Sequence, residues 1–176
     1  MTPLPLAAPV GPADHVLGPA GAPETLVVYG DYECPYTRIA RSVIRAAQRQ
    51  AGDRLRYVFR NFPLEKHPHA FRAAEAAEAA GAQGKFWEMY ELLFHGQQSL
   101  DDAHLASYAA QLGLDVGRFR NDLTAHVHAA RIQADREGGL LSGVEGTPTY
   151  FINGTRRPDL EEDPQKLLAA LRAGGE

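Results

Sequence analysis

Cysteine is almost missing from this chain, since its 176 residues include a single one, Cys34. One thiol excludes a framework of intramolecular disulfides. Long hydrophobic runs are also missing, and none approaches the roughly 20 apolar residues that cross a bilayer. Neither sign of charge dominates, because 18 Lys and Arg face 22 Asp and Glu, for a net charge of −4. This balance gives no reason to expect nucleic acid as the main partner.

The first twelve residues contain no Lys or Arg. The chain therefore lacks the basic region of a secretory signal at its start. On this ground we expect a cytoplasmic protein, with a mature exported form as the alternative. A lone cysteine fits a reducing compartment but does not decide between the two.

The composition that remains is that of an ordinary globular protein, with 44% hydrophobic and 23% charged residues. The length indicates one domain that can hold an inserted subdomain. Residues 1–13 are rich in Pro, Gly and Ala and predict an extended N-terminal arm. Residues 14–19 predict a short edge strand that Gly18 and Pro19 end.

The one cysteine stands between a strand pattern and a helix pattern. The apolar run 26–29 predicts a buried strand, and residues 30–33 predict a turn. A helix is then expected over about 35–51, with Pro35 at its first position, where proline is tolerated. Cys34 would lie at the helix N-terminus, where free N–H groups and the helix dipole favour an anion. We expect this thiol to ionise more readily than a free one.

The other patterns complete a mixed α/β chain. Residues 55–59 alternate and predict a strand parallel to the first, because a helix connects the two. Most of the segment up to residue 138 shows helical spacing. The further predicted elements are helices over 70–80, 86–94, 105–112 and 119–139, strands over 149–152 and 155–157 with a turn at 153–154, and a C-terminal helix from 163–164.

The active-site motif carries a family resemblance. Four residues resemble the Cys-x-x-Cys site of the thioredoxin fold with its second cysteine replaced: Cys34, Pro35, Tyr36 and Thr37. The surrounding residues 29–36 are similar to DsbA-like thiol–disulfide oxidoreductases, especially the bacterial branch related to FrnE-type and antiporter-fused domains. Residues 61–64, 67–68 and 83–87 extend the similarity. Thr147 and Pro148, just before a strand, resemble the cis-proline loop that faces the cysteine in this family.

The resemblance implies a thioredoxin-like α/β fold with an inserted α-helical subdomain. Residues 14–66 and 139–176 would form the thioredoxin-like domain, and residues 67–138 would form the insertion. It also implies that Cys34 is a nucleophile that forms mixed disulfides with glutathione or protein thiols. The partner chain would bind at Pro35, Tyr36, Thr147 and Pro148. No cofactor is expected apart from glutathione as a co-substrate, and the chain is expected to be a monomer or a weak dimer.

Two departures from the family pattern bear on the chemistry. Thr37 cannot resolve a mixed disulfide as a second thiol would, so an external thiol would have to. Its hydroxyl, one helical turn from Cys34, is expected to donate a hydrogen bond to the thiolate. Val28 stands where relatives often carry a carboxylate that assists proton transfer to the second cysteine. Asp31 and Glu33, in the turn, are expected to be solvated.

Other interpretations of these residues stay open. Cys34 could be a small buried hydrophobe, although its place beside Pro35 argues against this. The domain could have lost redox turnover and serve as a peptide-binding or chaperone-like module. Two chains could also pair through their Cys34 thiols. The histidine pairs at 67 and 69 and at 126 and 128 do not predict a metal site, because residues two apart do not share a helix face.

Overall fold

A five-stranded mixed sheet organises the computed structural model, which describes residues 4–173. Its strands, in the order β1-β3-β2-β4-β5, are β1 (His15–Leu17), β2 (Glu24–Gly30), β3 (Leu55–Asn61), β4 (Thr149–Ile152) and β5 (Thr155–Arg156). Strands β2 and β3 are parallel and the other pairs are antiparallel. The predicted strands are therefore confirmed. Residues 1–3 of the predicted arm and 174–176 of the predicted C-terminal segment lie outside the described residues.

Strand β2 is apolar along its length because both faces of the sheet are covered. Successive side chains point to opposite faces. Leu26 and Val28 contribute to the larger hydrophobic core, whereas Val27 and Tyr29 contribute to a smaller one. All seven residues of β2 are buried. This explains why the strand reads as a continuous hydrophobic run rather than an alternating one.

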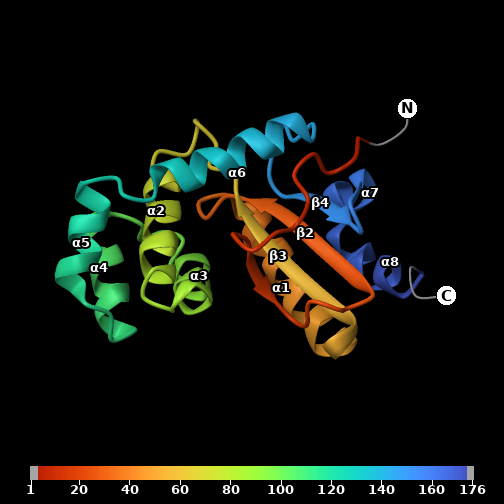
Figure 1. The fold of residues 1–176 in the computed structure, drawn as a ribbon, viewed down its shortest axis with the longest axis horizontal. Coiled ribbons are helices and arrows are strands. Elements are labelled where there is room, and N and C mark those ends of the chain that lie inside the picture. Colours follow the sequence, from red (N-terminus) through yellow and green to blue (C-terminus); the bar gives the residue numbers. More distant parts are fainter. Residues whose placement is uncertain (1–3, 174–176) are drawn as a thin grey trace.

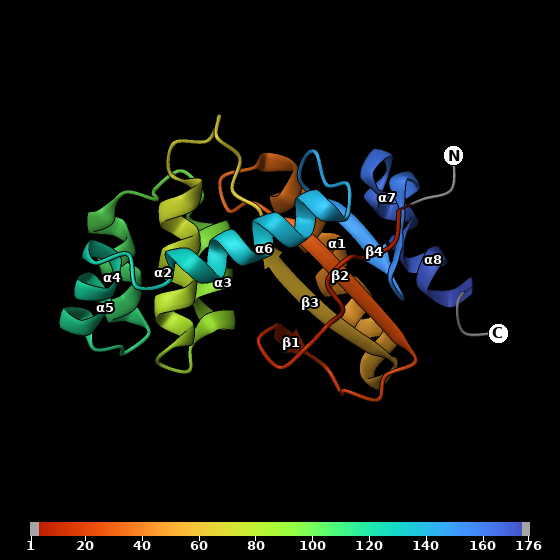
Figure 2. The same ribbon diagram turned by 45° about the horizontal axis from the view of Figure 1, so that its top comes forward.

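Residues 4–173 form eight α-helices. They are α1 (Pro35–Ala51), α2 (Ala70–Gly81), α3 (Phe86–His95), α4 (Asp102–Gln111), α5 (Val116–Thr124), α6 (Ala129–Leu141), α7 (Pro158–Glu162) and α8 (Leu167–Ala173), with short 3₁₀ turns at Gly52–Arg54 and Pro164–Lys166. Figure 1 shows α2 to α5 gathered at one end of the sheet. Figure 2 shows α6 reaching from that group across to the sheet.

Local signals place the ends of several helices as predicted. Pro35 begins α1, and Gly52, with φ of 53°, ends it. The carboxylate of Asp101 caps α4 by accepting hydrogen bonds from the N–H groups of Ala103 and His104. The turn between β4 and β5 places Asn153 and Gly154 at positive φ, as a two-residue hairpin turn requires.

The helix predicted over 119–139 is wrong, because two helices occupy this segment. Helix α5 ends at Thr124, and His126 adopts a φ of 51°, which an α-helix cannot contain. The imidazole Nδ1 of His126 lies 2.7 Å from the buried carboxylate of Glu75 in α2, which fixes the break. Val127, which follows Phe119 and Leu123 at helical spacing in the sequence, is 57% exposed.

Two smaller differences occur elsewhere. Helix α7 is absent from the sequence prediction, although Pro158 stands at its start. Ile39, which shares the helical spacing of the predicted apolar face of α1, is 54% exposed. The buried face of α1 is formed instead by Thr37, Ala40, Val43, Ile44 and Ala47.

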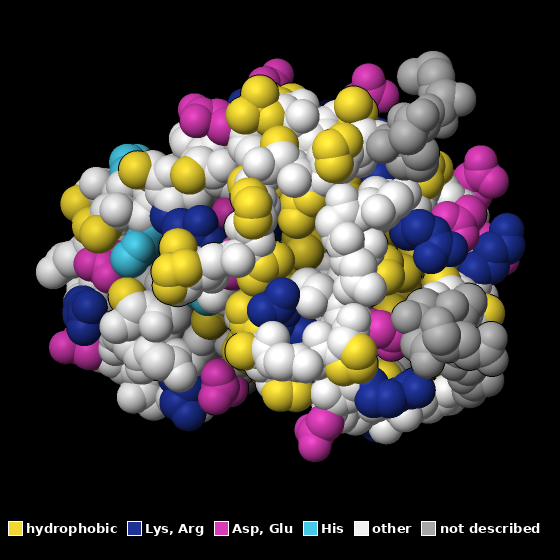
Figure 3. Space-filling view, turned by 45° about the vertical axis from the view of Figure 1, so that its right-hand side comes forward, with side chains coloured by type: hydrophobic (Ala, Val, Ile, Leu, Met, Phe, Trp, Pro, Cys, Tyr) yellow, Lys and Arg dark blue, Asp and Glu magenta, His cyan; other side chains and the backbone are white. Residues whose placement is uncertain are grey.

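The surface of the molecule mixes charges of both signs. On the face drawn in Figure 3, Lys and Arg side chains lie beside Asp and Glu side chains, with small groups of hydrophobic side chains between them. The described residues form several ion pairs, among them Arg156–Glu161 and Arg157–Asp159. Within residues 4–173, every helix is too short or too polar to span a membrane.

Candidate active site

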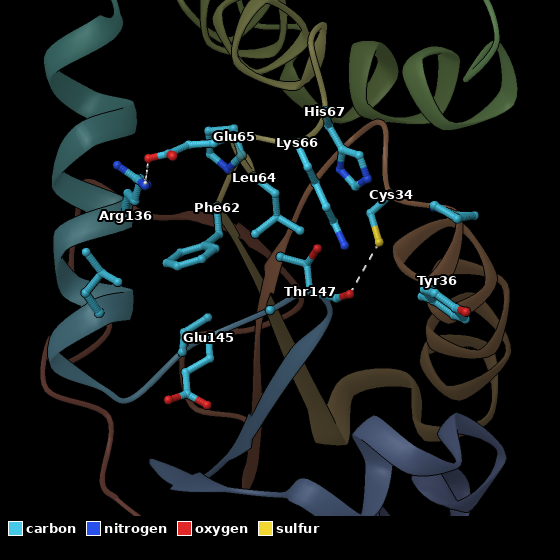
Figure 4. A pocket seen from close by; sticks show the side chains of 15 residues that line it. Cys34, Tyr36, Phe62, Leu64, Glu65, Lys66, His67, Arg136, Glu145 and Thr147 are labelled. Carbon is cyan, nitrogen blue, oxygen red and sulfur yellow. Dashed lines mark hydrogen bonds and ion pairs between the residues drawn. The ribbon is translucent and has the colours of Figure 1, made fainter.

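Cys34 is the N-cap residue of α1, as predicted, and it lies on the wall of a groove. Its backbone is extended, with φ of −74° and ψ of 121°, and its N–H donates to the carbonyl of Asp31. The residue is 3% exposed. Its thiol donates a hydrogen bond to the carbonyl oxygen of Thr147 over 3.3 Å, so the structure brings together two segments far apart in the sequence (Figure 4). This hydrogen bond exists only while the sulfur carries its proton.

The groove has a volume of about 770 Å³. It lies between the start of α1, the loop after β3, the end of α6 and the loop before β4. Figure 4 shows its labelled side chains, which are Cys34, Tyr36, Phe62, Leu64, Glu65, Lys66, His67, Arg136, Glu145 and Thr147. A groove of this volume can hold a short extended peptide or a tripeptide.

The predicted binding residues fall on two sides of the sulfur. Pro35 and Tyr36 line the groove from α1, and Tyr36 is 69% exposed. Thr147 lines it from the other side, and the peptide bond between Thr147 and Pro148 is cis. The hydroxyl of Thr147 is buried and has no hydrogen-bond partner among the described residues.

Thr37 differs from its expected arrangement. Its hydroxyl accepts a hydrogen bond from the backbone N–H of Asp31 over 3.4 Å, and the side chain is buried. Among the described residues, no hydrogen bond joins this hydroxyl to the sulfur of Cys34. Val28, the other departure from the family pattern, is completely buried in the larger core. The sheet beneath the thiol is therefore apolar at this point.

The expectation that Asp31 is solvated is wrong, whereas the Glu33 side chain is partly exposed. The Asp31 side chain is completely buried, and its carboxylate accepts hydrogen bonds from the N–H groups of Glu33 (2.7 Å) and Leu64 (2.9 Å). Its Oδ2 also lies 2.7 Å from Nδ1 of His67. The Glu33 carboxylate accepts from the backbone N–H of His69 and lies 3.0 Å from Nδ1 of that ring. Both carboxylates are hydrogen-bonded by partners in the loop after β3.

Gln97, which the sequence analysis missed, fixes the turn from the helical side. It is buried, and its Nε2 donates to the carbonyls of Tyr32 and Cys34, each over 2.9 Å. Tyr32 packs against Phe59 of β3 and Phe94 of α3. The reactive turn is therefore held by the sheet and by the helical group together. A single glutamine after a helix has no sequence pattern that would have revealed this role.

Most histidines pair with a carboxylate rather than with one another. In the two histidine pairs of the sequence, His67 and His69 contact Asp31 and Glu33. His126 and His128 contact Glu75 and Asp122. Within residues 4–173, no group of three or more His, Cys, Asp or Glu side chains is arranged to hold a metal ion.

Comparisons with known proteins agree with this geometry. The family model described as thioredoxin matches residues 11–172. Na(+)/H(+) antiporter NhaA 1 of Salinispora arenicola is 50% identical over 153 residues, which is 86% of this chain and 23% of that protein. The chain thus spans about a quarter of the length of that relative.

Solved structures share the fold over nearly the whole chain. Oxidised BdbD from Bacillus subtilis has a TM-score of 0.82 with 21% identity, covering 98% of this chain and 96% of that one. Wolbachia pipientis alpha-DsbA1 has a TM-score of 0.74 with 20% identity, covering 95% and 96%. At these identities the likeness establishes a DsbA-like fold.

Proposed function

This chain belongs to the thioredoxin family and has a DsbA-like fold, and from that premise we propose that it catalyses thiol–disulfide exchange by a monothiol route. One observation carries the proposal. The only thiol of the protein is placed at the N-terminus of α1, in a groove, with the backbone of Thr147 as its neighbour. A helix N-terminus favours the thiolate, which is the attacking form.

The exchange involves Cys34 and two external sulfur compounds. The Cys34 thiolate attacks one sulfur of a disulfide, such as oxidised glutathione or a disulfide-bonded protein. A bond forms between Sγ and that sulfur, the original S–S bond breaks, and the other half leaves as a thiolate. With no second cysteine in the chain, an external thiol attacks the mixed disulfide and releases Cys34.

The groove supports a peptide-like partner. Tyr36 and Leu140 present apolar surface at its rim, each more than half exposed. Lys66 and His67 add polar groups to the lining of the groove, and the backbone carbonyl of Thr147 lies 3.3 Å from the sulfur. Such a mixture of apolar walls and few polar groups is typical of sites that bind small molecules or peptide segments. Glutathione, itself a tripeptide, fits this description.

The proposal is tested by exposing the folded chain to oxidised glutathione and measuring the intact mass. We expect one glutathionyl group to be added at Cys34 and to be removed by reduced glutathione. Cys34→Ser should gain no mass. The proposal fails if the folded wild-type chain stays unmodified while the same chain in denaturant is modified.

A second candidate function is peptide binding without redox turnover. The observation in its favour is the low exposure of Cys34, 3%, beside a rim of exposed apolar side chains. Under this alternative, an unfolded peptide without cysteine would bind equally well to wild type and to Cys34→Ser, and no glutathione adduct would form. Binding measured by fluorescence anisotropy, together with the mass experiment, separates the two functions.

A further inference from the structure

A buried carboxylate and a histidine form a pair at the edge of the groove. Oδ2 of Asp31 lies 2.7 Å from Nδ1 of His67, and the Asp31 side chain is completely buried while 18% of the His67 side chain is exposed. His67 lines the same groove as Cys34, and Figure 4 shows its ring beside the Cys34 side chain. It is the one histidine among the described residues that line this groove.

The hydrogen bonds determine which ring nitrogen carries a proton. The Asp31 carboxylate also accepts hydrogen bonds from two backbone N–H groups, those of Glu33 and Leu64, so both of its oxygens act as acceptors. An ionised carboxylate only accepts, so Nδ1 of His67 must be the donor. In the neutral imidazole, Nε2 then has a free lone pair. No hydrogen bond of Nε2 exists among the described residues.

We propose that His67 is the acid–base group for Cys34 and that Asp31 positions it. This inference rests on the proposed function and adds the proton path that this function needs. The thiol proton of Cys34 is held in a hydrogen bond with the Thr147 carbonyl, which cannot take it away. Val28 supplies no carboxylate beneath the site. An imidazole with a free nitrogen, held by a carboxylate, is a group that can accept this proton near neutral pH.

The proposed steps balance in protons and electrons. Nε2 of His67 takes the proton from Sγ, and the thiolate attacks a sulfur of the disulfide R–S–S–R. One R–S⁻ leaves and receives the proton from the imidazolium, so a thiol and a disulfide become a mixed disulfide and a thiol. In the second half, His67 deprotonates the external thiol and reprotonates Cys34 as it leaves. No further oxidant or reductant is needed.

Other charged groups line the same groove from three elements. Lys66 and Glu65 lie in the same loop, Arg136 lies in α6, and Glu145 precedes β4. Glu65 and Arg136 form an ion pair of 3.0 Å, which largely cancels their fields. Lys66 forms no ion pair among the described residues, and Figure 4 shows its side chain extending toward the sulfur. A cation at this position attracts the negative charge that develops on the sulfur during exchange.

The pair also has a structural effect, because it ties the loop after β3 to the reactive turn. The test must therefore keep the hydrogen bond to Asp31 while removing Nε2. The substitution His67→Asn meets both conditions. Its side-chain amide can donate to Asp31 in place of Nδ1, and it has no atom that corresponds to Nε2. A matched control is His69→Asn, because His69 pairs with Glu33 in the same loop but does not line the groove.

The measured quantity is the rate of glutathione addition to Cys34 from oxidised glutathione, as a function of pH. At pH 7 we expect His67→Asn to react about 10-fold or more slowly than wild type, in the lower range of acid–base effects. The difference should vanish above about pH 9.5, where free thiols ionise unaided. His69→Asn should follow the wild-type profile. Asp31→Asn should also slow the reaction at pH 7 and not above about pH 9.5, because an amide can donate to Nδ1 and so no longer fixes Nε2 as the free nitrogen.

Two results would overturn the inference. His67→Asn could match wild type at every pH, in which case the pair is only a structural tie. Its rate could also be lowered equally at all pH values, which would indicate damage to the groove rather than a lost proton acceptor. His67→Gln is measured in parallel, so that poor folding of one variant, monitored by thermal unfolding, leaves the other to decide. If wild type forms no adduct at all, the proposed function fails, and this inference fails with it.

Discussion

The hydroxyl of Thr37 and the backbone nitrogen of Asp31 are 3.4 Å apart, and the N–H donates to the hydroxyl. Thr37 therefore helps to close the turn that carries Cys34 instead of pointing free into the groove. The position where relatives have a second thiol is buried and lies one helical turn from the first. A cysteine at position 37 would therefore lie in the buried space that the Thr37 side chain occupies.

Thr37→Cys should restore an intramolecular disulfide with Cys34. Cysteine is close to threonine in size, and positions one turn apart at a helix N-terminus meet the spacing that a disulfide needs. We expect the variant, but not wild type, to oxidise a reduced, disulfide-containing test protein and speed its refolding. Thr37→Val serves as the control for loss of the hydroxyl. A wild type as active as Thr37→Cys would mean that the missing thiol is no deficit.

The low exposure of Cys34 should make its reactivity depend on reagent size. The sulfur is reached through the groove, and the residue is 3% exposed. Folding should slow the reaction of Cys34 with both reagents. The slowing should be about 10-fold greater for a polymer-linked maleimide than for iodoacetamide, because only the small reagent fits the groove. Labelling followed by mass spectrometry measures both rates. Equal protection against the two reagents would contradict this picture.

A buried carboxylate away from the groove should govern the pH dependence of stability. Burial raises the pKa of Asp135 to about 6, although Arg131 opposes this. The folded pKa lies above the unfolded value of 3.8, so the contribution of Asp135 is complete below the unfolded pKa and is lost as pH rises to about 6. Asp135→Asn, which does not titrate, removes this loss.

The free energy of unfolding of wild type, relative to Asp135→Asn, should fall by roughly 1 to 3 kcal/mol between pH 4 and 7. Urea denaturation of both proteins at several pH values measures the difference. The contribution of Glu78 to stability changes with pH in the opposite direction. Burial alone would raise its pKa, but hydrogen bonds with His15 and Asn61 keep the pKa low. Its contribution is lost as pH falls from about 4.5 through the lower folded pKa, and this loss occurs in both proteins. A pH-independent difference between the two proteins would refute the assignment to Asp135.

Helix α6 approaches the sheet closely at Gly139. A Cβ at this position would lie 2.8 Å from ring atoms of Phe62 and 3.0 Å from the ring of Tyr29. Gly139→Ala should therefore cost about 1 to 3 kcal/mol of stability through overpacking. It should also slow glutathione addition, because Phe62 lines the groove. Chemical denaturation and the mass assay measure the two effects.

Gly117→Ala in α5 is the matched control for Gly139→Ala. Its new Cβ would meet only the Asp115 carboxylate, at 3.4 Å. The higher helix propensity of alanine should then stabilise the protein by up to about 1 kcal/mol. If both glycine substitutions changed stability in the same direction, close packing of α6 would not be the reason.

The sequence predicted correctly those helix ends and strands that are determined by residues close by in the chain. The apolar run of β2, Pro35 at the start of α1 and Gly52 at its end act within a few positions, so their effects can be read without the fold. The break at His126 depends on a hydrogen bond with Glu75, 51 positions away. Nothing in the periodicity of that segment could reveal it.

The sequence predicted the position of the reactive sulfur in the candidate site. It did not predict the polar side chains that surround the sulfur. Cys34 and Thr147 came from the motif and the family resemblance. The burial of Asp31 arises from Leu64 and His67, which fold back onto the turn from beyond β3. Carboxylates in turns are usually solvated, so the sequence favoured the wrong environment. Only the tertiary structure shows that this loop covers the turn.

The sheet order has a consequence for biosynthesis. Strand β2, which leads into Cys34, pairs with β4, where Leu26 lies opposite Ile152. The helices α2 to α6 must therefore leave the ribosome before Thr147 can reach the sulfur. Long-range pairings of this kind form late, because the loop must close first. During translation the thiol is thus without its carbonyl partner and groove wall, and this interval is when it is most open to indiscriminate oxidation.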